Sequence, residues 1–568
     1  MSKIIGIDLG TSTSEVAVLE NGKPFVIKNK EGKLITPSVV GISDSGAIIV
    51  GEYAKEQLLV KPDETVMEVK RLMGTDKKVS MGDNEYTPQQ ISAHILEYLK
   101  SCAEDYIGEQ IERAVITVPA YFTDEQRRAT VEAGGIAGFK VERIINEPTA
   151  AALAYGIEHM EDEKHILVYD LGGGTLDVTL LEMFEGVLEV KASSGNNKLG
   201  GKDFDEKLMD MLIKDFEKEE GVDLKKDLRA VARIKEAAEN CKIVLSTKNE
   251  YDINLPFIAE KNGEPIGLVR KVTKGQFEEL IWELVKSTEE PINVVLKDAE
   301  LLKTDIDIVL LVGGSTRIPL VKEFLQETLD KEPKTLVDPD MAVVMGAAIQ
   351  AGIINNELSQ DKDILITDVC PYTLGIETLG FLGGIPVADV YDIIIPRNLT
   401  IPVIKEKIYG TVVENQEKVE IKIYQGDRKK ASMNNFLGNF TLSGIPANRA
   451  FEEKIKVKFM YDINGILQVG AQIVSTGKQA SISIETTGVK LEEEMDLNLW
   501  KKSTKARKFK GIIKRAENML DEYFESEEYD ELDEIVRELK KAIIKEDDDE
   551  KIQELEEKLS DILFDMEE

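Results

Sequence analysis

The pattern of apolar and polar positions divides the chain into three blocks. In the first block, short β-branched runs such as "KIIGIDLG", "RAVITVPA", "HILVYDLG" and "DIVLLVGG" end in Gly, Pro or Asp, and helical stretches such as "DEQRRATVEAGGIAG" lie between them. Strands that alternate with helices are typical of an α/β domain. We therefore expect an α/β domain over residues 1–362.

The second block alternates with a period of two. Val419 and Ile421 share one face of the run "EKVEIKIYQG", and "KIKVKFMYDINGILQVGAQI" has an Asn-Gly pair between two alternating runs, which predicts a hairpin. This pattern predicts an antiparallel β-sandwich over residues 370–496. Over residues 497–568 the strand signals stop, and charge-rich segments with a narrow apolar stripe predict short α-helices.

The segment "DILITDV", residues 363–369, joins the first two blocks and has an unexpected composition. A connector between domains is normally polar and loose. Here Ile364, Leu365 and Ile366 form an apolar strip ahead of Asp368, with no Gly or Ser. The composition predicts a linker that is buried in at least one state of the protein.

Composition and charge exclude several classes of function. A chain of 568 residues is too long for one hydrophobic core, and its net charge of −35 argues against a nucleic-acid partner. No apolar run approaches the roughly 20 residues that span a bilayer, and the N-terminus lacks the features of a signal peptide, so we expect no membrane partner and a cytoplasmic location. Three scattered cysteines and three histidines predict neither a disulfide framework nor a metal cage.

The candidate chemistry lies in the first block, where one pattern occurs twice. "IGIDLGTST" and "VYDLGGGTLDV" each place an Asp at the end of an apolar strand, then a glycine turn, then hydroxyl groups. Small residues let backbone N–H groups approach an oxyanion, Thr11 or Thr175 adds a hydroxyl, and Asp8, Asp170 or Asp177 can hold hydrated Mg²⁺. Two such turns from two similar halves predict a site that grips a polyphosphate.

A third element, "VLLVGGSTRIP", suits a nucleoside. Its glycines permit a close approach, and the guanidinium of Arg317 can stack on a base. Each of the three elements alone could be an ordinary Gly-rich turn, but their combination favours a nucleotide site. A P-loop is excluded because Asp203 follows Lys202 where Ser or Thr is needed, and a dinucleotide fingerprint is excluded by Leu176 and Asp177.

In combination, these and further motifs resemble the DnaK-type heat-shock chaperone family over essentially the whole chain. The motifs are "IDLGTS", "VPAYFTDEQRRAT", "RIINEPTAAALAYG", "DLGGGTLDV", "LGGKDFD", "EAAENCKIVLS", "GGSTRIP" and "MGAAIQAG". The resemblance implies an actin-like ATPase domain, a β-sandwich that binds peptide, and a helical lid. "ILITDVCPYTLGIE" and "MYDINGIL" are most similar to the short bacterial paralogue HscC.

The resemblance also implies roles for individual residues. Catalysis falls to Lys70, Asp8, Glu147, Thr175 and Asp177, and Mg²⁺ is held mostly through water by Asp8, Glu147, Asp170 and Asp177. Positions implied to bind ATP are Gly10, Thr11, Ser12, Asp170, Gly172, Gly173, Gly174, Thr175, Gly200, Gly201, Glu239, Lys242, Ser246, Gly313, Gly314, Ser315, Arg317 and Asp340. Those implied to bind peptide are Ile376, Thr378, Leu379, Tyr409, Val412, Val419 and Ile421.

Some of these residues have a plainer interpretation when the resemblance is set aside. Lys70 alone would be a surface helix lysine, and Glu239 with Lys242 would be a routine helical charge pair. Alternation places Val419 and Ile421 on one face, but it leaves open whether that face is a peptide groove or the core.

The resemblance gives the apolar linker a function and the chain its partners. The linker, with Ile364, Leu365, Ile366 and Asp368, is implied to dock as a strand on the ATPase domain in one nucleotide state and to leave it in the other. The implied ligands and partners are ATP or ADP, Mg²⁺, K⁺, unfolded polypeptides, a J-domain co-chaperone and, as an open alternative, a nucleotide-exchange factor. Positions that would meet the J-domain are Arg143, Asn146, Thr149 and Asp368.

Two other function classes use the same ATPase fold, namely a small-molecule kinase and an actin-like filament protein. Neither explains an apolar linker that leads into a β-sandwich. The sequence also departs from the family pattern: Thr367 stands where a leucine is expected, extra residues "FLGGIPVADVYD" follow Gly380, and the helical segment is short. These departures predict altered domain coupling and a different border to the peptide groove.

Overall fold

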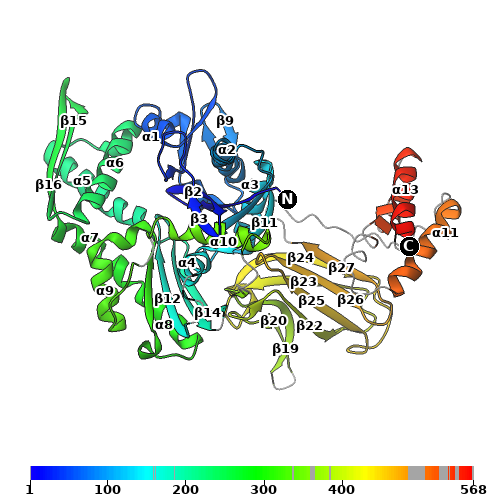
Figure 1. The fold of residues 1–568 in the computed structure, drawn as a ribbon. Coiled ribbons are helices and arrows are strands. Elements are labelled where there is room, and N and C mark those ends of the chain that lie inside the picture. Colours follow the sequence, from blue (N-terminus) through cyan, green and yellow to red (C-terminus); the bar gives the residue numbers. More distant parts are fainter. Residues whose placement is uncertain are drawn as a thin grey trace.

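The computed structural model has an α/β part, a β-sandwich beside it, and helices at the C-terminal end (Figure 1). The structure describes residues 2–157, 159, 162–184, 186–335, 338–358, 365–382, 385–483, 506–522, some positions between 532 and 543, and 549–565. The predicted succession of blocks is confirmed at this level. The domain boundaries at residues 362, 370 and 497 stay predictions.

The first lobe of the α/β part is built on a sheet with the order β11-β10-β1-β2-β3, and β4 pairs with β2. The strand β1 runs antiparallel to β2 and parallel to β10, which is parallel to β11. The strands are β1 (Ile4–Leu9), β2 (Thr13–Glu20), β3 (Lys23–Val26), β4 (Thr36–Pro37), β10 (Arg113–Val118) and β11 (Lys140–Asn146).

The second lobe repeats this scheme. Its sheet has the order β17-β12-β13-β14-β18-β21, with β12 antiparallel to β13 and parallel to β17. The strands are β12 (Lys164–Leu171), β13 (Leu176–Phe184), β14 (Val187–Asn196), β17 (Ile308–Val312), β18 (Leu365–Val369) and β21 (Thr400–Ile401). The two motifs that look alike in the sequence therefore form equivalent hairpins, β1–β2 and β12–β13.

Two apolar helices pack within the core of this part. They are α4 (Glu147–Gly156), in which every residue is buried, and α10 (Ala342–Ile354). A helix that is apolar on all sides must be covered on all sides. The contact is close: a Cβ built on Gly346 of α10 would lie 1.8 Å from the carbonyl oxygen of Ala150, and one on Gly6 would lie 2.3 Å from the nitrogen of Ala348.

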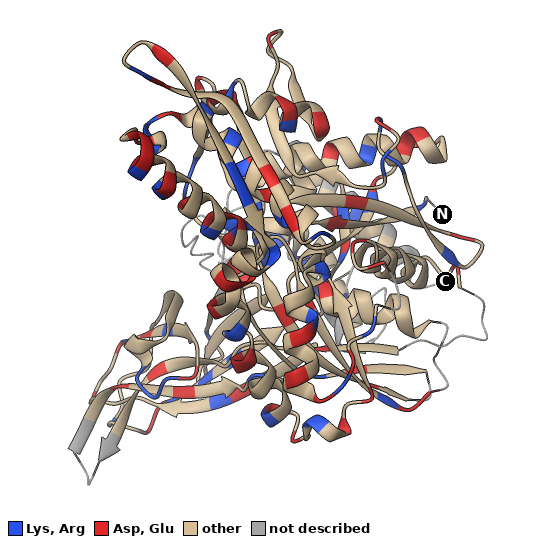
Figure 2. Ribbon diagram, turned by 90° about the vertical axis from the view of Figure 1, so that its left-hand side faces the viewer, with Lys and Arg blue, Asp and Glu red and all other residues tan. Residues whose placement is uncertain are grey.

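Three outer helices of the α/β part begin at capping boxes that the sequence encodes. Thr87, Thr123 and Thr273 each bond the amide of a Gln three residues later, and each Gln bonds back. Figure 2 shows acidic residues interspersed with basic ones along such elements. The outer helices are α1 (Glu52–Leu58), α2 (Pro88–Ile107), α3 (Asp124–Ile136), α5 (Gly201–Glu220), α6 (Leu228–Leu245), α7 (Lys274–Lys286), α8 (Glu289–Asp298) and α9 (Pro319–Leu329). The remaining strands of the α/β part are β5 (Val39–Ile42), β6 (Ile48–Val50), β7 (Thr65–Met67), β8 (Val79–Met81), β9 (Asn84–Tyr86), β15 (Glu250–Lys261) and β16 (Glu264–Thr273).

The second block forms two antiparallel sheets, β20-β19-β23-β24 and β22-β25-β26-β27, as predicted. The predicted hairpin is β25–β26, and Gly465 in its turn has a φ of 72°. Inward-facing residues of both sheets share one core. The strands are β19 (Leu374–Leu382), β20 (Ile385–Ile395), β22 (Val403–Gly410), β23 (Lys418–Gln425), β24 (Asn435–Ser443), β25 (Lys454–Tyr461), β26 (Leu467–Ile473) and β27 (Gln479–Ser483).

The described C-terminal helices are α11 (Ala506–Glu522) and α13 (Asp549–Asp565). Ile552, Leu555 and Leu559 of α13 are buried in a core that these helices share with other C-terminal residues. The predicted apolar stripe is thereby confirmed as a packing face.

The linker lies on the α/β part, which the resemblance predicts to be the ATPase part, as strand β18. It runs parallel to β14, with Leu188 opposite Ile366 and Glu189 opposite Thr367. Ile366 packs on the core of the α/β part, whereas Leu365 is 59% exposed. The expected burial of Leu365 is therefore wrong for this arrangement, because alternation along a strand turns it away from the face that Ile366 buries. Ile364 lies outside the described residues.

Polar contacts also join the sandwich to the ATPase part. The amide of Leu467 donates to Asp124 at 2.6 Å, and Asn464 accepts from the amide of Ile144 at 2.9 Å. Asp298 accepts from Arg397 and Asn398 at 2.8 Å each. The bond of Leu467 with Asp124 is buried and the other three are partly buried, so this interface is made of single polar contacts, as in interfaces between domains that move.

Thr367 supplies the first prediction. Its hydroxyl oxygen is buried in the docked linker and has no partner among the described residues. Thr367→Val removes the hydroxyl at nearly constant shape and should stabilise docking by about 1–3 kcal/mol. Thr149→Val, which removes a 3.1 Å bond to Asp368, should weaken docking. Protease protection of the linker measures both, and equal protection in the two variants would contradict the prediction.

Asp124 supplies a second prediction, on pH. Burial raises the pKa of Asp124 to about 6 against the opposing charge of Arg128, and burial also raises the pKa of Asp368. A pKa that is higher in the docked state means that docking takes up a proton, so docking weakens as the pH rises through about 6. We expect the docking constant to fall about tenfold between about pH 5 and 7 and to change little above that. Asp124→Asn should flatten most of this dependence, measured by linker protection against pH.

Candidate active site

The glycine turns of the two lobes meet face to face. A Cβ built on Gly173 would lie 2.1 Å from Ser12 Oγ, and one on Gly174 would lie 2.8 Å from Thr11 Cγ2. Gly200 is as crowded, because its Cβ would lie 2.4 Å from the nitrogen of Gly174. At Gly200 the crowding atoms belong to the backbone of Gly173 and Gly174, so no side chain fits there, whereas Gly173 and Gly174 lie against the side chains of Ser12 and Thr11 of the other lobe. The two predicted phosphate turns therefore form one site.

Four carboxylates converge on this place from different elements. Asp8 ends β1, Asp170 and Asp177 face each other across β12 and β13, and Glu147 begins α4. Asp8 accepts a hydrogen bond from Thr117 at 2.7 Å. Asp170, Asp177 and Glu147 are buried.

Lys70 lies among these carboxylates. It is on a 3₁₀ turn (Val69–Leu72), is 6% exposed, and its Nζ is 2.6 Å from Glu147 Oε1. The interpretation of Lys70 as a surface lysine is therefore wrong. Burial, and next the charge of Glu147, raise the pKa of Asp8 and of Asp177 to about 7. Burial, and next the charges of Glu147, Asp177 and Asp8, raise the pKa of Asp170 well above its usual value.

One ammonium group does not balance three buried carboxylates and the partly buried Asp8, so the ionised site favours further positive charge. Asp177 Oδ2 is buried and lacks a partner in the described part of the chain, as expected of an oxygen that awaits a cation or its water. Within the described residues, no three His, Cys, Asp or Glu side chains are grouped to hold a metal directly. The unpartnered Oδ2 of Asp177 and the group of carboxylates around it fit a hydrated Mg²⁺, and its binding through water stays a prediction.

The third sequence element lies beside the two turns. Gly313 has a φ of 81°, and the hydroxyl of Ser315 donates to the carbonyl of Gly172 at 2.9 Å. A Cβ on Gly201 would lie 2.5 Å from Ser315 Oγ, and Gly314 lies against Asp340. The third element therefore packs directly on the second phosphate turn.

Two ion pairs border this region. Lys242 pairs with Asp205 of α5 at 2.7 Å, and Glu239 pairs with Lys55 of α1, in the other lobe, at 2.9 Å. The interpretation of Glu239 and Lys242 as a helical charge pair is thus wrong, because each finds its partner on another helix. Arg317 pairs with Asp340 and Asp338, and the hydroxyl of Ser246 donates to the carbonyl of Lys242. Contact of these residues with adenosine stays a prediction.

The sequence analysis missed residues that the fold brings into the site. Glu15 is directly opposite Asp8 in the β1–β2 pair, is 2% exposed, and burial raises its pKa well above the usual range. Arg71 pairs with Asp203 at 2.7 Å and reaches the carbonyl of Gly174. Glu15 could have been found from the position of Asp8 and the hairpin register, but nothing in the sequence pointed to the Arg71 pair.

The predicted peptide-binding residues differ in how deeply their side chains are buried. Ile376 and Ile421 are buried in the sandwich core. The remaining residues lie at or near the surface: Val419 and Tyr409 pack against the core, Thr378 is half-buried, and Leu379 and Val412 are exposed. Peptide binding by this set stays a prediction.

The residues expected to meet a J-domain are placed beside the linker. Asp368 accepts from Asn146 Nδ2 at 2.7 Å and from the hydroxyl of Thr149 at 3.1 Å. Arg143 donates to Gln350 of α10 at 3.0 Å. The docked linker is therefore bonded to the residue that directly precedes Glu147.

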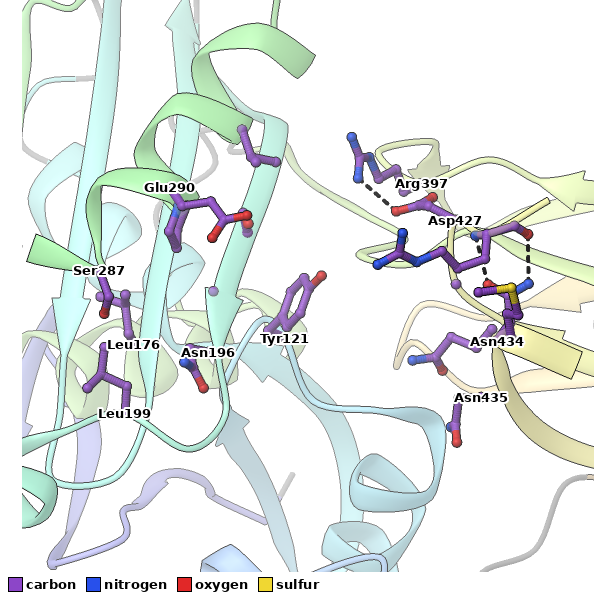
Figure 3. A pocket seen from close by; sticks show the side chains of 18 residues that line it. Tyr121, Leu176, Asn196, Leu199, Ser287, Glu290, Arg397, Asp427, Asn434 and Asn435 are labelled. Carbon is purple, nitrogen blue, oxygen red and sulfur yellow. Dashed lines mark hydrogen bonds and ion pairs between the residues drawn. The ribbon is translucent and has the colours of Figure 1, made fainter. Parts of the chain in front are cut away.

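A cavity of about 660 Å³ lies between the ATPase part and the sandwich (Figure 3). Tyr121, Ser287 and Glu290 line it from the ATPase part, and Arg397 and Asp427, 2.8 Å apart, line it from the sandwich. Its walls show that the two parts meet around a polar space and do not share a core.

This architecture defines a class: a two-lobed nucleotide hydrolase whose linker strand connects a β-sandwich to the catalytic half. A family model described as "Hsp70 protein" matches residues 4–568. The chain is 50% identical over 494 residues to "Chaperone protein DnaK" of Thermotoga petrophila. The aligned residues make up 86% of this chain and 81% of that relative. The chain belongs to the Hsp70 family, whose chaperones hydrolyse ATP. The kinase and filament alternatives are thereby set aside, and the closer likeness to HscC stays a prediction.

The described helices were also compared with the requirements of a membrane span. None combines the length and the apolar character that crossing a bilayer demands.

Lys70→Met is the prediction for this site. Within the described residues, Lys70 supplies the ammonium group that is bonded to Glu147, and its predicted role is to stabilise the charge on the transferring phosphoryl group. Its loss should therefore slow single-turnover ATP hydrolysis by about 10²–10³-fold while nucleotide binding persists.

Lys202→Met is the matched control. Lys202 is equally buried and pairs with Glu68 at 2.6 Å, outside the carboxylate group. Both variants should unfold at lower temperature, but hydrolysis by Lys202→Met should stay within a few-fold of the parent. Equal losses in the two variants would reduce the role of Lys70 to stability.

Proposed function

We propose that the chain is an ATP-dependent chaperone in which an actin-like ATPase domain controls how tightly the sandwich holds extended apolar segments of unfolded proteins. One observation carries the proposal. The linker residue Asp368 is bonded to Asn146, and the next residue in the chain is Glu147, the partner of Lys70. The position of the sandwich and the geometry of the catalytic residues are therefore coupled over a few bonds.

The chemistry of hydrolysis asks for positioning and charge. Asp8, Asp170, Asp177 and Glu147 would hold Mg²⁺ mostly through water, and Mg²⁺ when bound would neutralise phosphate charge. Lys70 stabilises the charge that develops on the transferring phosphoryl group, and it is held in place by Glu147. Backbone N–H groups and the hydroxyls of Thr11 and Thr175 bind the terminal phosphate. K⁺ bound at the same carboxylates would neutralise their remaining negative charge.

The linker has the energy to act as a switch. Ile366 packs on the ATPase core and Val369 is buried, while Leu365 contributes little in this state. Burial of one aliphatic side chain is worth about 1.5–3 kcal/mol. Couplings between sites in allosteric proteins are typically about 1–3 kcal/mol. A single well-buried residue can therefore supply the bias between docked and released states.

The partners follow from the same geometry. An extended peptide would bind beside β19 and β23 by main-chain bonds and side-chain pockets. A J-domain that touches Arg143, Asn146 and Thr149 would act where Asp368 is bonded, and so could loosen the linker. An exchange factor is a further candidate partner, and a cytoplasmic location fits these partners.

Anisotropy of a labelled apolar heptapeptide tests the proposed function. The parent chain should release the peptide with ATP and hold it with ADP or without nucleotide. Ile366→Asp should hold the peptide in all conditions while basal hydrolysis continues, because a carboxylate packed in this partly buried place against an apolar core opposes docking.

Leu365→Asp is the control for the linker, since Leu365 is exposed in the docked strand. It should release the peptide with ATP as the parent does. Equal uncoupling by both variants would show that the docked strand described here is not the switch, and ATP-independent affinity in the parent would refute the proposed function.

A further inference from the structure

The backbone of Tyr121 forms hydrogen bonds on both sides of the interface between the catalytic residues and the sandwich. Its backbone N–H donates to Asp177 Oδ1 at 3.0 Å. Its carbonyl oxygen accepts from Asn197 Nδ2 at 2.6 Å and from the hydroxyl of Tyr372. Asn197 belongs to the ATPase part, whereas Tyr372 belongs to the segment that leads from the linker strand into the sandwich. One residue thus links the two parts through its own backbone.

Tyr372 reaches this place only because the linker is docked. It lies between β18, which pairs with β14, and β19, the first strand of the sandwich. Its ring centroid is 4.5 Å from that of Tyr121, with an interplanar angle of 49°. Figure 3 shows Tyr121 between the ATPase residues and the sandwich residues of the interdomain cavity. Release of the linker would withdraw both the ring contact and the hydroxyl.

The bond to Tyr121 decides how Asp177 is oriented. Oδ1 is held by the N–H of Tyr121, while Oδ2 is buried and has no partner where the structure is described. The N–H and the carbonyl of Tyr121 flank the same Cα, so a clamp on the carbonyl restricts the φ and ψ that aim the N–H. A fixed donor holds the carboxylate in one rotamer and turns Oδ2 toward the site of the cation.

We propose that Tyr372 is a positioning residue for ATP hydrolysis, which fixes Tyr121 through its hydroxyl and thereby orients the carboxylate of Asp177 when the sandwich is docked. This inference rests on the role in catalysis proposed above for Asp177. The bond of Tyr372 to Tyr121 would be a second connection of this kind, besides the bond of Asp368 to Asn146 on another part of the same interface. The sandwich would then act on two catalytic carboxylates, Glu147 and Asp177.

Tyr372→Phe tests the inference, since it removes the hydroxyl and keeps the ring. Single-turnover hydrolysis should slow by about 2–10-fold, as expected for one hydrogen bond, with ATP affinity unchanged. Amide hydrogen exchange at Tyr121 should become faster. Both effects should vanish in an Ile366→Asp background, in which the linker is released and the hydroxyl is already absent from the interface.

Two control variants separate positioning from other effects. Tyr391→Phe removes a tyrosine hydroxyl that bonds the carbonyls of Thr373 and Tyr424 inside the sandwich, so it controls for stability. Asn398→Gly removes a 2.8 Å bond across the interface to Asp298, and its φ of 61° suits glycine, so it controls for weaker docking. Tyr391→Phe should leave amide exchange at Tyr121 unchanged. Asn398→Gly should change that exchange only as far as its weaker docking, measured by linker protection, accounts for.

The outcomes are distinct. If Tyr372→Phe and Asn398→Gly give the same hydrolysis rate and the same exchange at Tyr121 when compared at equal linker protection, Tyr372 acts through docking alone and the inference is overturned. If Asp177→Asn leaves hydrolysis unchanged, the role proposed for Asp177 fails and the inference fails with it. A loss in Asp177→Asn together with slower hydrolysis and faster exchange only in Tyr372→Phe supports both.

Discussion

The constraint on which the rest depends is a deficit of positive charge in a buried place. Asp8, Asp170, Asp177 and Glu147 come together from both lobes, and Lys70 is the one ammonium group that the described residues bond to them. Carboxylates that are buried without full compensation resist ionisation, as the raised pKa of Asp8 and of Asp177 shows. A cation bound among these carboxylates would relieve that cost, and it would be held by residues of both lobes.

The second half of the design is an interface that is weak enough to open. Between the ATPase part and the sandwich, single polar bonds such as those of Asp124 with Leu467 and of Asp298 with Arg397 replace a shared apolar core. A polar interface loses little when water takes its place, so small changes at the catalytic residues can shift the balance. The unsatisfied hydroxyl of Thr367 places the linker on the weak side of that balance.

The proposed catalysis and the proposed coupling use the same stretches of backbone. Asn146 holds the linker and is followed by Glu147, and Tyr121 bonds Asp177 with its N–H and the sandwich with its carbonyl. Since strand ends and helix starts meet at this edge of the two sheets, the residues that position the carboxylates are also the ones that a docked domain can reach. No separate relay through the core is needed.

The sequence by itself determined the three blocks, the two phosphate turns, the Asn464-Gly465 hairpin and the stripe on α13, because periodicity, turn glycines and capping pairs act over a few neighbouring residues. Only the tertiary structure decided that Lys70 is buried, that Leu365 is exposed while Ile366 packs, and that Glu15 and Tyr372 lie near the catalytic carboxylates. Those facts depend on which strands become neighbours and on which face is covered. Such contacts join residues far apart in the chain, and local patterns carry no record of them.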